Sequence, residues 1–199
     1  MSEVKTSPLT KKGKETRRKI LATAEQVFGE KGYFETSVAE ITLRTGVAQG
    51  TFYNYFPTKK AVFECLIQQL SSDLRYEIKQ AMSRYETFQE KQKAGYKAFF
   101  HWVLEHRNLY SIVQQAVLVD HDLYRWYYEK IAEGFIRSIE QAIDSGDCKA
   151  LAPETVAYCM MGIGQFIGMR WVLWENRIVP EKVFDEAMEV VFHGIVGKE

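Results

Sequence analysis

The sequence predicts an all-α protein of about nine helices, with a three-helix, helix-turn-helix domain at the N-terminus and a larger helical domain after it. Apolar residues recur at spacings of three and four along most of the chain. The alternation that indicates strands is scarce, and only four prolines occur. Residues 38–60 have the pattern of a short helix, a glycine turn and a second short helix. These three observations favour the all-α class.

Charge is divided unevenly along the 199 residues. Residues 1–60 contain eleven Lys and Arg against six Asp and Glu, and the rest of the chain contains fifteen against twenty. A basic end on an acidic body suits a protein that binds a polyanion through that end, although chance segregation is an alternative. The three cysteines match no metal or redox spacing, and no signal-peptide pattern opens the chain. We expect reduced, mostly buried thiols and a cytoplasmic protein.

The first helix is expected from about Glu15 to Lys31, with Gly32 at its end. Residues 1–14 before it are polar and basic, and we expect a disordered tail. Entry of this basic arm into a DNA minor groove is the alternative.

A second helix is expected to follow, capped by Thr36 or Ser37. Glu40 lies three residues after Ser37, which is the spacing of a capping box. Gly46 follows the last turn, where a left-handed residue often ends a helix and glycine adopts that conformation most cheaply.

The third helix is expected from about Gln49 to Phe56, and Pro57 stops it. Phe52 and Phe56 lie four residues apart and should both face the core. The remaining side chains then face outward, and amide and hydroxyl groups of this kind bind base edges and phosphates in DNA. They are Gln49, Thr51, Tyr53, Asn54 and Tyr55, and Gly50 would let the backbone approach DNA closely.

The fourth helix begins at Lys59, after a cap at Thr58, and is expected to reach the region of Tyr85. Because it starts without a Gly/Ser/Pro-rich linker, we place a domain boundary at its start, which gives a DNA-binding domain at 15–58 and a second domain at 59–199. Further apolar stretches occupy 88–118, with a helix junction at 106–108, and 120–145.

The last two helices, about 153–176 and 180–196, carry broad apolar faces. A membrane span is the alternative for the first, but its uncharged part falls short of about 20 residues, and it contains Gln165 and Arg170. We therefore expect no membrane association and a homodimer formed through these two helices.

The segment GVAQGTFYNYFPTKKAVF, with FGEKGYFETSVAEI upstream, resembles the DNA-binding region of the TetR family of bacterial transcription regulators over about residues 15–65. The resemblance implies a dimer in which each subunit has three DNA-binding helices and a helical ligand-binding body. It implies contacts to an operator in double-stranded DNA by residues on the second helix, on the third helix and at their flanks. Carried over by position, these are Arg44, Gln49, Thr51, Tyr53, Asn54 and Tyr55, with Thr36 or Ser37 and Lys59 on phosphates.

The body resembles, more distantly, regulators in this family that respond to acyl-CoA, on the stretch HRNLYSIVQQAVL followed by DLYRWYYEKI. With an aromatic content of 14%, an apolar effector pocket is expected, although each aromatic could simply pack the core. Two arginines are candidate partners of an anionic group, with a structural ion pair or a surface position as the alternative. With these arginines included, the candidate residues of the effector pocket are Phe99, Trp102, Tyr110, Arg125, Trp126, Tyr127, Phe166 and Arg170.

No catalytic constellation emerges from the sequence. His101 and His106 are five residues apart and do not share a helix face, and the GIGQFIG glycines lack the context of a dinucleotide fingerprint. We expect no enzyme, no cofactor and no metal. The prediction is a repressor that a small, largely apolar effector releases from a palindromic operator. The alternatives are a TetR-like protein controlled by a protein partner and a multidrug sensor, and the latter would carry buried carboxylates.

Overall fold

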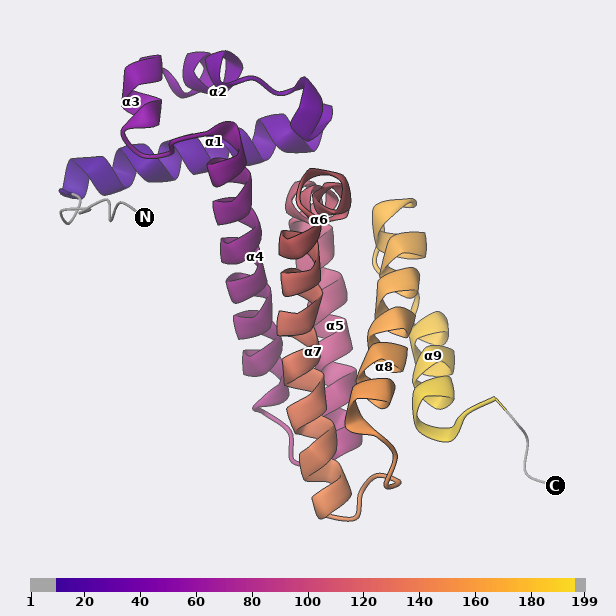
Figure 1. Cartoon of the computed structure of the whole chain (residues 1–199). Helices are drawn as coiled ribbons and strands as arrows, with labels where there is room; N and C mark the ends of the chain where they lie inside the picture. Colours follow the sequence, from indigo (N-terminus) through magenta and orange to yellow (C-terminus); the bar gives the residue numbers. More distant parts are fainter. Residues whose placement is uncertain (1–9, 196–199) are drawn as a thin grey trace. The chain divides into compact units, whose positions relative to one another are not determined.

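The computed structural model describes residues 10–195, and every regular element in that range is helical, which confirms the predicted all-α class. Figure 1 shows the helices in chain order. Their bounds are α1 Lys11–Glu35, α2 Val38–Thr45, α3 Gln49–Tyr53, α4 Lys59–Met82, α5 Phe88–Glu105, α6 Arg107–Val119, α7 His121–Asp144, α8 Pro153–Ile167, the π-helix η1 Gly168–Leu173 and α9 Glu181–His193.

The chain divides into two compact units. Unit 1 consists of the residues up to Gln68 together with Asn108–His121, and unit 2 consists of Gln69–Arg107 and the residues from Asp122 onward. Unit 1 therefore adds the start of α4 and nearly all of α6 to the three N-terminal helices. The functional boundary at Lys59 that the sequence suggested stays a prediction.

The prediction that residues 1–14 form a disordered tail is wrong for residues 11–14. Residues 1–9 lie outside the described residues, but Lys11 to Lys14 belong to α1, whose predicted start was Glu15. Thr10 caps this helix, because its hydroxyl accepts a hydrogen bond of 3.2 Å from the backbone N–H of Gly13. At the other end Gly32 breaks the helix with φ 83°, as predicted, and one further turn follows.

Local capping signals set the ends of α2, and the structure selects one of the two N-caps that the sequence left open. Ser37 is the N-cap, and its hydroxyl accepts from the backbone N–H of Glu40 at 3.1 Å. Gly46 ends the helix in the left-handed region at φ 74°. Thr58 similarly accepts from Ala61 at the start of α4. The helix α3 ends at Tyr53, three residues before the predicted end, and Asn54 follows as its C-cap.

The core of unit 1 fixes the short helix α3. Phe52 is completely buried and Phe56 is 3% exposed, which confirms that both face inward. The ring of Phe56 also lies under the Arg17 guanidinium, at 5.0 Å from its centroid. A five-residue helix has little stability of its own, so these two aromatic anchors hold it in place.

In unit 2, helix α5 contacts α7, α8 and α9, and the four run side by side in Figure 1. The Gln92 amide donates to the Ser138 hydroxyl at 3.0 Å, and the Tyr96 hydroxyl donates to the carbonyl of Met160 at 2.8 Å. Burial raises the pKa of Tyr96 far above its ordinary value. Gly164 allows the close approach of α8, since a Cβ there would lie 2.8 Å from the Tyr96 ring.

The predicted helix 153–176 is not a uniform α-helix. Pro153 occupies the first turn as predicted, but after Ile167 the chain continues as the π-helix η1. The Arg107 guanidinium donates to the carbonyl of Leu173 at 2.7 Å at its end. In the described range, Pro153–Leu173 passes the length and composition test for a membrane span, a test that core helices of soluble proteins also pass.

The cysteines depart from their predicted burial. All three are free thiols, but Cys159 is exposed, and Cys65 and Cys148 are half-buried.

Candidate functional site

The recognition surface is built on α3. Gln49, Gly50, Tyr53 and Asn54 are exposed, whereas Thr51 and Tyr55 are half-buried. Tyr53 is 52% exposed, and its ring stands edge-on to the buried ring of Phe52 at 5.4 Å. The helix therefore presents amide and hydroxyl groups to solvent while its aromatic core residues hold it rigidly.

Arg44 stands in the last turn of α2, before the turn that leads to α3. Its Nη1 donates to Glu30 Oε2 at 2.7 Å and its Nη2 donates to Glu40 Oε1 at 2.9 Å. Lys31 donates to the same oxygen of Glu40 at 2.6 Å. The hydrogen bond to Glu30 is the largest cause that raises the pKa of Arg44, and the one from Lys31 is the largest that lowers the pKa of Glu40.

Thr36 and Ser37, the two alternative phosphate contacts at the start of α2, differ in their exposure. Thr36 is 2% exposed and its hydroxyl donates to the carbonyl of Gly32 at 2.7 Å, so the prediction that this side chain contacts phosphate is withdrawn. Ser37 is exposed, and its hydroxyl proton is still free to bind a phosphate while its oxygen caps α2.

Lys59 has a structural role that the sequence did not indicate. Its Nζ donates to the carbonyls of Tyr33 and Thr36, each at 2.7 Å, and lies 4.2 Å from the centroid of the Tyr33 ring. Burial lowers the pKa of this ammonium. Only one of its three N–H donors is left for a phosphate, and the predicted phosphate contact stays untested.

The side chain of the next residue, Lys60, is also held by an ion pair. Lys60 pairs with Asp120 at 2.6 Å, and that hydrogen bond is the main cause that raises the Lys60 pKa. Glu30, Lys31 and Asp120 had no role in the sequence analysis. The spacing of four between Glu40 and Arg44 could have indicated one of these pairs. The pairs of Glu30 and Lys31 join α1 to α2, and Lys60–Asp120 joins residues far apart in sequence, so helical spacing does not indicate them.

The candidate effector residues do not form one group. Within unit 2, Trp102 and Tyr127 are buried, and Phe99 and Trp126 are half-buried. Tyr110 is buried but belongs to unit 1. The remaining three are exposed at the surface and are withdrawn as pocket residues: Phe166 at 65%, Arg125 in an ion pair with Glu129, and Arg170 in one with Glu175.

Two buried hydroxyls in unit 2 stand out. Tyr127 Oη and Ser71 Oγ have no hydrogen-bond partner among the described residues, although Tyr127 is 1% exposed and Ser71 is fully buried. Burial raises the pKa of Tyr127 far above its ordinary value, so it stays a neutral hydroxyl. A buried polar group without a partner costs about 1–3 kcal/mol, which a ligand atom could recover.

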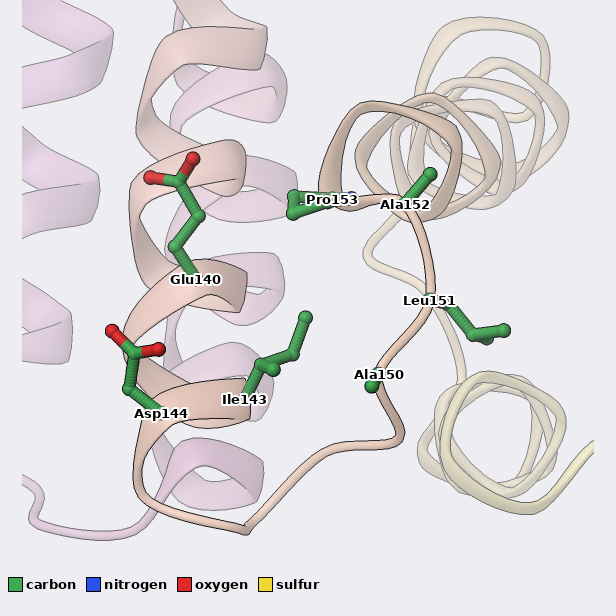
Figure 2. A pocket seen from close by; sticks show the side chains of 7 residues that line it. All are labelled: Glu140, Ile143, Asp144, Ala150, Leu151, Ala152 and Pro153. Atoms are coloured by element: carbon green, nitrogen blue, oxygen red, sulfur yellow. The ribbon is translucent and has the colours of Figure 1, made fainter.

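A shallow depression of about 630 Å³ lies where the C-terminal end of α7 faces the loop before α8 (Figure 2). Its lining contains none of the candidate effector residues. The lining residues are Glu140, Ile143, Asp144, Ala150, Leu151, Ala152 and Pro153. Within residues 10–195 no group of three or more His, Cys, Asp or Glu side chains could hold a metal ion.

The fold and the α2–α3 surface define a helix-turn-helix DNA-binding regulator. Residues 20–66 match the profile of the family described as bacterial regulatory proteins, tetR family. This match identifies a TetR-family DNA-binding domain at residues 20–66 of the chain.

Relatives cover both units. The chain is 28% identical over 138 residues to the HTH-type transcriptional regulator YvdT of Bacillus subtilis (strain 168), a match that covers 69% of this chain and 68% of YvdT. It is 24% identical over 185 residues to the fatty acid metabolism regulator protein of the same organism, covering 90% of this chain and 95% of that protein.

Among solved structures, the transcriptional regulator FadR from Bacillus subtilis in complex with stearoyl-CoA matches with a TM-score of 0.80. The identity is 20%, and the match covers 90% of this chain and 99% of that one. FadR from Bacillus halodurans matches with a TM-score of 0.81 at 20% identity, over 98% and 100% of the two chains. At these identities the likeness shows the fold.

Proposed function

We propose that the protein is a dimeric, cytoplasmic repressor that binds a palindromic operator and is released from it by an effector of the fatty acyl-CoA class. The observation that carries the DNA-binding part is the outward face of α3, where Gln49, Tyr53 and Asn54 are exposed beside two buried phenylalanines. Gln and Asn side chains can pair with adenine in the major groove, and Tyr hydroxyls bind phosphates.

The dimer is proposed to form through α8, η1 and α9. Tyr158 and Phe166, eight residues apart, lie on one face of α8 and are 46% and 65% exposed. Trp174 after η1 is 67% exposed, and Val190 on α9 is 41% exposed. Large apolar side chains grouped on one pair of helices are typical of a protein interface. In the dimer, two recognition helices would enter successive major grooves about 34–36 Å apart.

An acyl effector is supported by three observations. Unit 2 supplies aromatic side chains for an apolar chain, including Trp102 and Tyr127, and the unpartnered hydroxyls of Tyr127 and Ser71 could bind its polar atoms. Two FadR proteins share the fold, and one of them was solved with stearoyl-CoA. By contrast, Glu105, Glu129 and Glu133 are not buried, which does not favour a sensor of cationic drugs.

The test has two stages. In vitro selection from random duplexes, followed by footprinting, should recover a palindrome whose half-sites are protected one helical turn apart. Recovery of no preferred sequence would refute the repressor. Stearoyl-CoA, free stearate and free CoA are then added to the complex, and release by stearoyl-CoA alone supports the effector class. Retention of DNA in all three arms would refute an acyl effector and leave control by a protein partner.

A further inference from the structure

Four charged side chains of unit 1 form a continuous chain of ion pairs across α1 and α2. From one end to the other they are Lys31, Glu40, Arg44 and Glu30, joined by contacts of 2.6, 2.9 and 2.7 Å. Two acids and two bases cancel, so that Arg44 and Lys31 add no net charge to this surface. We call these four residues the charge chain.

Stability does not explain the charge chain. Its side chains are between 20% and 52% exposed, and exposed ion pairs stabilise a fold little because water and salt screen them. Glu40 also stands at the position from which a glutamate completes a capping box with Ser37. Its carboxylate instead accepts hydrogen bonds from the two cations. The Glu40 carboxylate therefore neutralises Arg44 and Lys31, and it does not add a second cap to the start of α2.

The position of the charge chain points to DNA. Arg44 lies two residues before Gly46, the turn that leads into α3. It bridges carboxylates from two helices, which fixes the plane of its guanidinium and occupies two of its five N–H donors. Three donors remain, and their direction is restrained by Glu30 on one side and Glu40 on the other.

We propose that Glu30 and Glu40 set DNA specificity by competing with phosphates for Arg44 and Lys31. This inference rests on the proposed DNA-binding function. Non-specific binding comes almost entirely from phosphate contacts and counterion release, so cations that are already neutralised contribute little to it. On the operator, base contacts by α3 fix the register, and Arg44 uses its remaining donors in the orientation that the carboxylates impose. The charge chain thus weakens non-specific binding more than operator binding.

The experiment compares Glu30→Gln and Glu40→Gln with the wild type on a labelled duplex of random sequence, about 30 base pairs long, at several salt concentrations. Gln keeps the size of the side chain and removes its charge. We expect about three- to tenfold tighter binding to random DNA and a log–log salt slope steeper by about one per subunit. Glu40→Gln should have the larger effect, because Glu40 holds both cations. Affinity for the selected operator should rise less, so that the ratio of the two affinities falls.

Two controls make the result specific. Glu86→Gln changes the net charge equally at an exposed position between α4 and α5, and it should leave both affinities unchanged. In the double variant Glu30→Gln with Arg44→Gln, the gain on random DNA should disappear, since Glu30 acts through Arg44. Circular dichroism verifies that each variant is folded.

The inference is overturned if either carboxylate variant binds random DNA no more tightly than the Glu86→Gln control, or if the gain from Glu30→Gln persists without Arg44. A wild-type protein that binds neither the random duplex nor any selected sequence would instead refute the proposed function itself. The two failures are therefore distinguishable.

Discussion

The backbone N–H of Tyr33 donates a hydrogen bond of 2.6 Å to Oε1 of Gln115, which joins α1 to α6 within unit 1. The positive φ of Gly32 turns this N–H out of the α1 ladder, and the Gln115 amide is held from its other side by the carbonyl of Ser111 at 3.3 Å. The ion pair between Lys60 in α4 and Asp120, the residue that follows α6, is a second link of this kind within unit 1. A residue 82 positions away thus satisfies a donor that Gly32 exposes.

Gln115→Ala should destabilise unit 1. The Tyr33 N–H would lose its acceptor in a part-buried site, at a cost of about 1–2 kcal/mol. Chemical denaturation measured by fluorescence gives the free energy of unfolding. Gln115→Glu keeps the acceptor oxygen and should retain most of the stability, so an equal loss in both variants would contradict this role of the hydrogen bond.

Gly29→Ala should also destabilise the contact between α1 and α6. A Cβ at Gly29 would lie 2.6 Å from Cβ of Asn108, an atom that cannot move without its backbone. The clash should cost about 1–3 kcal/mol. A Cβ at Gly134 in α7 would instead meet open space, so the matched change Gly134→Ala should stabilise by about 0.5–1 kcal/mol. Thermal melts of the two variants should therefore shift in opposite directions.

Tyr53→Ala should weaken operator binding while the fold is retained. The side chain is 52% exposed, and loss of one DNA contact costs about 1–3 kcal/mol, or roughly tenfold or more in affinity. Phe52→Ala provides the contrast, because it empties a fully buried site and should unfold α3 at a cost of about 3–5 kcal/mol. A footprint unchanged by Tyr53→Ala would contradict the orientation proposed for α3 on DNA.

The ion pairs of Glu40 should make stability depend on pH in the acid range. The hydrogen bond from Lys31 is the main cause that lowers the folded-state pKa of Glu40 below its ordinary 4.5. A lowered carboxylate pKa stabilises the fold above the unfolded pKa, and this stabilisation is lost as pH falls through the folded pKa. The difference in urea midpoint between wild type and Glu40→Gln should thus be small, fully present above the ordinary pKa of 4.5, and lost as pH falls through the lower folded-state pKa. A difference that grows towards low pH would contradict this assignment.

Phe166→Glu should convert the proposed dimer to a monomer. It places a charge on the exposed apolar face of α8, where Phe166 is 65% exposed and therefore contributes little to the fold of one subunit. Light scattering coupled to size-exclusion chromatography measures the mass. Leu151→Glu is the control, since Leu151 is 58% exposed outside this face. A Phe166→Glu protein that keeps the wild-type mass would place the interface elsewhere.

Features with local causes could be predicted from the amino-acid sequence. Gly46 set the end of α2, Pro153 set the start of α8, and the spacing of Phe52 and Phe56 set which face of α3 is buried. The start of α2 was narrowed to a cap at Thr36 or Ser37. These features depend on capping chemistry, backbone conformation and helical period, which a few neighbouring residues specify. The resemblance to the DNA-binding region of the TetR family rested on residues 15–65, which include α2 and α3.

The partners of the charged and polar side chains depend on how the helices pack and could not be predicted from the sequence. Lys59 was expected on phosphate, but its ammonium is drawn to the carbonyls of Tyr33 and Thr36, and the Thr36 hydroxyl is buried against the carbonyl of Gly32. Arg44 forms a second ion pair with Glu30, which lies on another helix. A polar side chain binds whatever donor or acceptor the packing brings within about 3 Å, and helical periodicity does not specify which distant residue that is.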